Sequence, residues 1–92
     1  MKDLVTSTIR PRIGNGFRLQ WEAAQDCHVL LYPEGMVKLN ASAGQILLRC
    51  DGERSVEDIV TDLEAAFSAT GLEPEVRSFI EIAHRQRWLN WA

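Results

Sequence analysis

A chain of 92 residues, of which 46% are hydrophobic and 25% are charged, has the size and composition of one small globular domain and is too apolar for a disordered segment. Its formal net charge is −3, and the basic residues of its first twenty positions are not joined by a basic cluster later, which disfavours strong non-specific binding to nucleic acid. Apolar runs of membrane-spanning length and the apolar segment of a secretory signal are both missing, so we expect a cytoplasmic protein.

The start of the chain is polar and mixed, and it ends in Arg10-Pro11-Arg12-Ile13. Chain ends of this composition are often poorly ordered, so we expect a flexible N-terminal arm over residues 1–13 and a single domain over residues 14–92. Gly14-Asn15-Gly16 marks the boundary, because glycine tolerates the backbone angles of a tight turn.

Three strands are predicted before residue 40. Residues 17–21 alternate apolar and polar side chains, which is the period of a half-buried strand. Residues 27–32 are mainly apolar and end at a Pro-Glu-Gly turn, after which residues 36–39 form the third strand, with Val37 and Leu39 on its core side. Together they predict a three-stranded antiparallel meander.

From residue 41 onward the apolar residues recur at helical spacing. Asn40 or Ser42 caps a first helix, which Asp51-Gly52 ends, and Ser55 caps a second helix, which Gly71 ends. The buried sides of these two helices are expected to consist of Ala43, Ile46, Leu47 and Cys50 in the first and Val56, Ile59, Val60, Leu63 and Phe67 in the second.

The third helix begins at Glu73-Pro74-Glu75, with proline in the first turn, where its missing N–H leaves no hydrogen bond unmade. We expect Trp88, Leu89 and Trp91 to close the core beyond this helix, and Trp21 to be a core or cap residue. The fold class predicted is α+β and winged-helix-like, a three-stranded antiparallel sheet followed by a three-helix bundle. The inner face of the third helix is Val76, Phe79, Ile80 and Ala83.

Catalytic motifs are missing from the sequence, which contains no phosphate-binding glycine loop, nucleophile motif or metal-ligand pattern. We therefore expect no enzymatic activity and no cofactor. Cys27 and Cys50 are expected to be buried free thiols rather than a disulfide or metal ligands, because their spacing matches no zinc pattern.

The predicted third strand lies at an edge of the sheet, where backbone N–H and C=O groups lack partners on one side. Lys38 is the kind of residue that blocks such edges. The alternative is that an extended peptide joins as a fourth strand, with the adaptable side chain of Met36 beside it. Ordering a flexible peptide costs about 2–5 kcal/mol, so we expect micromolar affinity, about −8 kcal/mol.

Several segments together resemble one family. These are Arg10-Pro11-Arg12, Phe17-Arg18-Leu19-Gln20-Trp21-Glu22, Leu31-Tyr32-Pro33-Glu34-Gly35, Leu39-Asn40 and Cys50-Asp51-Gly52. They are similar to the PqqD family, the peptide chaperones of pyrroloquinoline quinone (PQQ) biosynthesis, over residues 10–92. The resemblance implies the fold of a RiPP recognition element, a domain that recognises ribosomal precursor peptides. It also implies that the protein carries no cofactor, binds the precursor peptide PqqA and presents it to PqqE, the radical S-adenosylmethionine enzyme that cross-links a glutamate and a tyrosine of that peptide.

In this recognition fold the leader part of the precursor pairs with the third strand and packs on the third helix. The resemblance therefore assigns the strand contact to Met36, Val37, Lys38 and Leu39. Helical spacing alone, without any motif, selects the helix contacts Arg77, Ile80, Glu81 and His84.

The alternative function is a winged-helix DNA-binding regulator, which would place the third helix in a major groove with Arg77, Arg85 and Arg87 toward the DNA. Glutamates on the same helix and the overall acidity disfavour it, so we expect no nucleic-acid partner and no membrane partner. Exposed strand edges permit either a monomer or a strand-exchanged homodimer.

Overall fold

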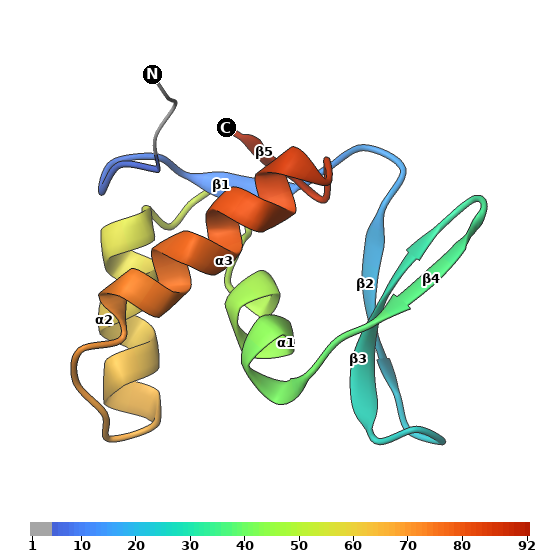
Figure 1. The fold of residues 1–92 in the computed structure, drawn as a ribbon, viewed down its shortest axis with the longest axis horizontal. Coiled ribbons are helices and arrows are strands. Elements are labelled where there is room, and N and C mark those ends of the chain that lie inside the picture. Colours follow the sequence, from blue (N-terminus) through green and yellow to red (C-terminus); the bar gives the residue numbers. More distant parts are fainter. Residues whose placement is uncertain (1–4) are drawn as a thin grey trace.

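The computed structural model describes residues 5–92, and Figure 1 shows their arrangement. The chain forms a three-stranded antiparallel sheet, three helices and an additional pair of short strands, which confirms the predicted α+β architecture. The elements are β1 (Pro11–Ile13), β2 (Arg18–Glu22), β3 (Cys27–Tyr32), β4 (Gly35–Lys38), α1 (Ala41–Leu48), α2 (Val56–Ala66), α3 (Glu73–Arg85) and β5 (Leu89–Trp91). Within residues 5–92 the longest helices are too short or too polar to cross a membrane.

The sheet has the strand order β2-β3-β4, so β3 is central and β2 and β4 are the edges. Leu19, Leu30 and Val37 form one cross-strand row, in which Leu30 is fully buried and the other two pack against the core. α1 packs on β3, and Figure 1 shows the sheet at one end of the molecule, α2 at the other and α1 between them. The hydrophobic core therefore lies on one face of the sheet, among the helices.

Side-chain caps fix where the first two helices begin, as the sequence predicts. The Asn40 side chain accepts a hydrogen bond from the backbone N–H of Ala43 (2.8 Å), and Ser42 is not the cap. Ser55 and Asp58 form a reciprocal capping box, in which each side chain accepts from the other residue's backbone N–H at 3.1 Å. These contacts satisfy N–H groups that a helix start would otherwise leave unpaired.

The end of the expected arm is paired rather than free, because β1 joins β5 in an antiparallel ladder. Gly14 N–H extends this ladder by donating to the Trp88 carbonyl oxygen (2.8 Å). A Cβ on Gly14 would lie 2.6 Å from the Arg87 carbonyl oxygen, so only glycine allows this approach. The prediction of a flexible arm through residue 13 is thus corrected at residues 11–13, and its first four residues lie outside the described part of the chain.

Residues 5–9 contact the start of α2. The carbonyl oxygens of Ile9 and Ser7 accept hydrogen bonds from the first two backbone N–H groups of α2, those of Val56 and Glu57 (2.9 and 3.1 Å). The Arg77 guanidinium donates to the Ser7 hydroxyl (2.8 Å) and to the Val5 carbonyl oxygen. This segment therefore completes the N-terminal cap of α2 and ties it to α3.

Two aromatic residues expected in the core lie at the surface. The side chain of Phe67 is 55% exposed, because α2 ends at Ala66 and Ser68 turns the chain with a left-handed φ of 51° before Gly71 is reached. Trp21 is 52% exposed and contacts His28 edge-on, with ring centroids 5.0 Å apart. Phe67 continues a helical pattern whose earlier members are buried, and Trp21 continues an alternation whose earlier members, Phe17 and Leu19, are partly buried. At its ends, each pattern therefore predicts more burial than the structure shows.

Candidate functional site

The outer edge of β4 presents backbone groups from alternate residues. Leu39 N–H donates to the His28 carbonyl oxygen (3.0 Å), so Leu39 and Val37 face β3 with their backbone groups. Met36 and Lys38 consequently point their N–H and C=O groups away from the sheet. Their side chains are exposed, whereas Val37 is half-buried and Leu39 is 6% exposed. Of the four predicted strand residues, two display the edge and two attach it to the core.

The four predicted helix residues face a different part of the molecule. Ile80 is fully buried, and His84 stacks on Trp91 with ring centroids 4.0 Å apart. Arg77 contacts residues 5–7 as described above and also bonds to Glu73 (2.7 Å), and Glu81 forms a salt bridge with Arg85 (2.7 Å). This side of α3 lies toward β5 and the N-terminal segment, so the structure does not gather these residues beside β4.

The opposite flank of α3 carries apolar surface that the sequence analysis did not assign to a site. Glu75, Phe79 and Ile82 are spaced four and three residues apart and therefore share one side of the helix. Phe79 is half-buried and packs against the core, while Ile82 is 48% exposed. Glu75, the first residue of this flank, lines an apolar pocket.

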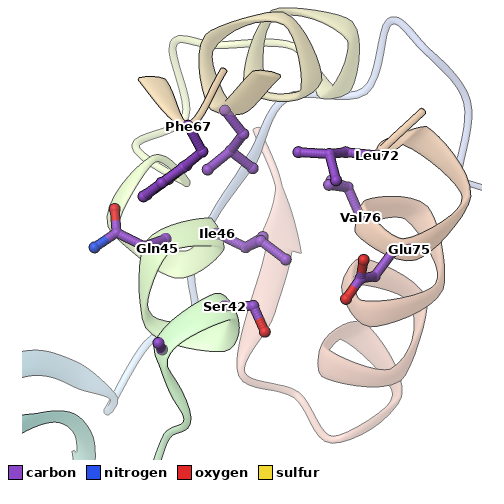
Figure 2. Close-up of a pocket in the computed structure, with 9 residues that line it drawn as sticks. Ser42, Gln45, Ile46, Phe67, Leu72, Glu75 and Val76 are labelled. Carbon is purple, nitrogen blue, oxygen red and sulfur yellow. The ribbon is translucent and has the colours of Figure 1, made fainter. Parts of the chain in front are cut away.

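This pocket, the interhelical pocket, lies between α1, the end of α2 and the start of α3 and has a volume of about 240 Å³. Figure 2 shows Ile46 and Phe67 pointing into it from one side and Leu72 and Val76 from the other, with Ser42 and Glu75 across its mouth. Its surface is almost entirely apolar. The complete lining is Ala41, Ser42, Gln45, Ile46, Leu63, Phe67, Leu72, Glu75 and Val76.

The pocket begins a few residues after the end of the edge strand β4. Ala41 and Ser42 line it, and only Leu39 and Asn40 separate Ala41 from the end of β4. The sequence does not reveal this pocket, because the apolar residues that line it follow the same pattern as ordinary core residues. The one available signal is Phe67, an aromatic residue at the very end of the apolar stripe of α2.

The titratable groups near the helix junctions have structural explanations. Cys50 is buried and free, and its thiol donates to the Ile46 carbonyl oxygen (3.2 Å). Burial, with a smaller effect of Asp51, raises the pKa of Cys50 to about 12, so the thiol stays protonated near neutral pH. The backbone N–H of Glu53, followed by that of Arg54, lowers the pKa of Asp51. Within residues 5–92, His, Cys, Asp and Glu side chains do not gather in groups of three that could hold a metal ion.

Comparison with known proteins identifies the family of this chain. Residues 27–89 match the family model described as "Coenzyme PQQ synthesis protein D (PqqD)". A "PqqA binding protein" of Pseudomonas aeruginosa (strain UCBPP-PA14) is 54% identical over 80 residues, covering 86% of this chain and 87% of that protein. Another of the same name, from Kluyvera intermedia, is 48% identical over 90 residues, covering 97% and 94%.

A solved structure supports the same assignment. The solution NMR structure of the PqqD truncation of Methylobacterium extorquens PqqCD, described as a functional and stand-alone RiPP recognition element, matches with a TM-score of 0.74. The match covers 89% of this chain and 88% of that one at 27% sequence identity. From the family match, the close relatives and the shared fold we conclude that this chain belongs to the PqqD family.

Proposed function

We propose that this chain is a non-catalytic, cytoplasmic peptide chaperone of PQQ biosynthesis, which binds the precursor peptide PqqA as a fourth strand on β4 and presents it to PqqE. The observation that carries the proposal is the open edge of β4, where Met36 and Lys38 turn their backbone N–H and C=O groups outward. Relatives that share about half of the sequence are named PqqA binding proteins. Peptide capture by strand addition needs such an edge and no catalytic group.

The edge gives affinity that depends little on sequence, and the faces beside it give selectivity. A strand paired with β4 would direct alternate side chains to the face of Val37, where the helices lie, and to the opposite face, where Lys38 lies. Lys38 would favour an acidic peptide residue beside it. A short strand with a few apolar anchors supports micromolar binding, about −8 kcal/mol, which also permits release.

For the helix side of the site we propose the exposed flank of α3 formed by Phe79 and Ile82, which continues from the interhelical pocket. The contacts predicted from spacing, at Arg77, Glu81 and His84, remain predictions that alanine substitutions can test. Ile80 would support the site from within the core, since its side chain is fully buried.

The DNA-binding alternative is not supported by the arrangement of the arginines it requires. Arg77 is bonded to Glu73 and to residues 5–7, and Arg85 is paired with Glu81. Both would have to leave these partners to reach a phosphate backbone, and the paired glutamates would then face the DNA.

Hydrogen exchange of the ¹⁵N-labelled chain, with and without the PqqA peptide of Pseudomonas aeruginosa, tests strand addition. We expect the amides of Met36 and Lys38 to exchange fast in the free chain and slowly in the complex, because the peptide supplies their missing acceptors. The matched control is the open edge of β2, where the backbone groups of Leu19 and Trp21 point outward in the same way. Their amides should stay fast, and slowing at β2 alone or at neither edge would overturn the proposal.

Presentation to PqqE is tested separately. Adding purified PqqE to the labelled chain and PqqA should broaden signals of the chain while the Met36 and Lys38 amides stay protected. Displacement of the peptide by PqqE would contradict a presenting role.

A further inference from the structure

We infer that the interhelical pocket takes one large apolar side chain of the precursor peptide, and that a basic peptide residue lies next to this anchor. The inference rests on the proposed function, because it concerns the part of the peptide that continues beyond the strand paired with β4. It assigns a specificity site to residues of α1, α2 and α3 that the strand edge does not include.

The size and lining of the pocket fit a single apolar group. An apolar cavity of about 150 Å³ stays dry and binds benzene, so a volume of about 240 Å³ has room for an aromatic ring or a branched aliphatic side chain. Ile46, Leu63 and Val76 form its floor and are themselves buried. A polar or charged side chain on this floor would lose its hydration without gaining hydrogen-bond partners.

Phe67 is the second observation. Its ring is 55% exposed at the rim of the pocket, immediately after the end of α2. Because Phe67 borders the opening, an apolar side chain that enters would cover part of the ring as well as the floor. One apolar side chain bound in the pocket would therefore bury apolar surface of both the pocket and the exposed ring.

The path of the peptide follows from chain continuity. A strand on the open edge of β4 that runs toward Lys38 continues past Leu39 and Asn40 to Ala41, at the pocket mouth. At roughly 3.3 Å per residue, a peptide residue about three positions beyond the one opposite Lys38 arrives there. Side chains on the Val37 face already point to the helix side of the sheet.

The charge at the mouth of the pocket favours a basic peptide residue next to the apolar anchor. Glu75 carries the only charged side chain in the lining of this pocket, and it lies across the mouth from Ser42. A lysine or arginine next to the anchor would meet this carboxylate, whereas an aspartate or glutamate would be repelled. The inferred ligand is therefore an apolar residue followed or preceded by a basic one.

The test measures affinity for the PqqA peptide of Pseudomonas aeruginosa by calorimetry in three variants. Ala41→Trp fills the mouth without removing a core contact, since Ala41 is exposed, and should weaken binding about tenfold to a hundredfold. Phe67→Ala should weaken binding severalfold. Leu48→Ala is the matched control, because Leu48 is 52% exposed on α1 outside the pocket, and it should bind like the unmodified chain.

Alanine scanning of the peptide identifies the anchor. One apolar position should lose affinity against the unmodified chain but lose none further against Ala41→Trp, which is the signature of direct coupling. Glu75→Lys should weaken binding, and exchanging the neighbouring basic peptide residue for glutamate should restore it. Equal losses in both backgrounds at every peptide position would overturn the inference.

One further measurement does not depend on the variants folding. In the unmodified complex, the methyl groups of Ile46, Leu63 and Val76 should show nuclear Overhauser contacts to a single peptide side chain, and their absence would overturn the inference. Protection of the Met36 and Lys38 amides without these contacts would support strand addition on β4 and would show that the peptide does not use the pocket. Failure of the unmodified chain to bind PqqA would overturn both.

Discussion

Cys50 shows how burial fixes the chemistry of a residue. Its thiol is 3% exposed, donates to the Ile46 carbonyl oxygen and lies one residue before the exposed carboxylate of Asp51. The low-dielectric surroundings disfavour the thiolate, and the neighbouring negative charge adds to this effect. A cysteine next to an aspartate is therefore a packing residue in this fold, and its protonated form contributes to stability.

The free energy of unfolding should fall as the pH rises above about 9. The thiol of the unfolded chain ionises near 9.0, whereas burial holds the folded thiol protonated until about 12. The stabilisation is therefore complete below the unfolded pKa and is lost at up to about 1.4 kcal/mol per pH unit above it. Urea unfolding at about pH 8 and about pH 10.5 should show a shallower decline of the free energy of unfolding for Cys50→Ala than for the unmodified chain. Equal declines in the two proteins would contradict this account.

Ser55 should contribute more to stability than its small size suggests. Its hydroxyl caps α2 as part of the capping box with Asp58, so Ser55→Ala should lower the free energy of unfolding by about 1 kcal/mol. Ser78→Ala is the control, because Ser78 is exposed within α3, where alanine is the better helix former. Urea denaturation of both variants gives the comparison, and a loss in Ser78→Ala as large as in Ser55→Ala would contradict a capping role.

Elements with strong local signals could be predicted from sequence, and elements made by distant pairing could not. β2, β3, β4 and the helix starts at Asn40 and Ser55 follow from alternation, a Pro-Glu-Gly turn and capping residues. β1 and β5 have three residues each, too few for a period to show, and they pair across almost the whole chain. The pattern of neighbouring residues therefore cannot predict that these two distant segments pair.

Of the two parts of the candidate site, the strand part could be predicted from sequence and the helix part could not. An edge strand follows from the order of three hairpin-linked strands, so Met36 and Lys38 could be placed at the edge of the sheet from sequence. Helical spacing identifies the buried side of α3 but does not say which flank lies toward the interhelical pocket. The spacing selected Arg77 and His84, whose flank lies toward β5, whereas the helix contacts that we propose, Phe79 and Ile82, lie on the other flank.

The contact between α1 and β3 gives a prediction with an unusual sign. Replacing glycine by alanine within a helix normally stabilises it by about 1 kcal/mol. A Cβ on Gly44, however, would lie 2.9 Å from Nδ1 of His28, so Gly44→Ala should destabilise the protein by about 1–3 kcal/mol. In a His28→Ala background the same change should be neutral or stabilising. A double-mutant cycle measured by urea unfolding gives the coupling, and additive effects would show that α1 and β3 pack less tightly than described.

At the scale of the whole molecule, the sheet and the helices share one core. Leu30 of β3 and Leu39, which follows β4, belong to the same buried cluster as Ile59 of α2 and Ile80 of α3. The β3–β4 turn extends away from the helices in Figure 1. The β4 strand is therefore attached to the domain along one side and open along the other, as the proposed capture of a peptide requires.

A shared core predicts a single unfolding transition. Variants with Trp21 or Trp88 as the only tryptophan report on the sheet and on the end of α3, respectively. Their fluorescence midpoints in urea should agree with each other and with the midpoint from circular dichroism. An earlier transition for the Trp21 reporter would show that the sheet opens as a separate unit.

The β1–β5 ladder has a consequence for how this domain can be joined to other proteins. The carbonyl oxygen of Arg10 accepts a hydrogen bond from the backbone N–H of Ala92 at 2.8 Å, so the last residue lies beside the start of β1, from which residues 5–9 lead on to α2 and α3. Figure 1 shows this last residue apart from the β3–β4 hairpin. A linker joined after Ala92 would thus leave the open edge of β4 unobstructed.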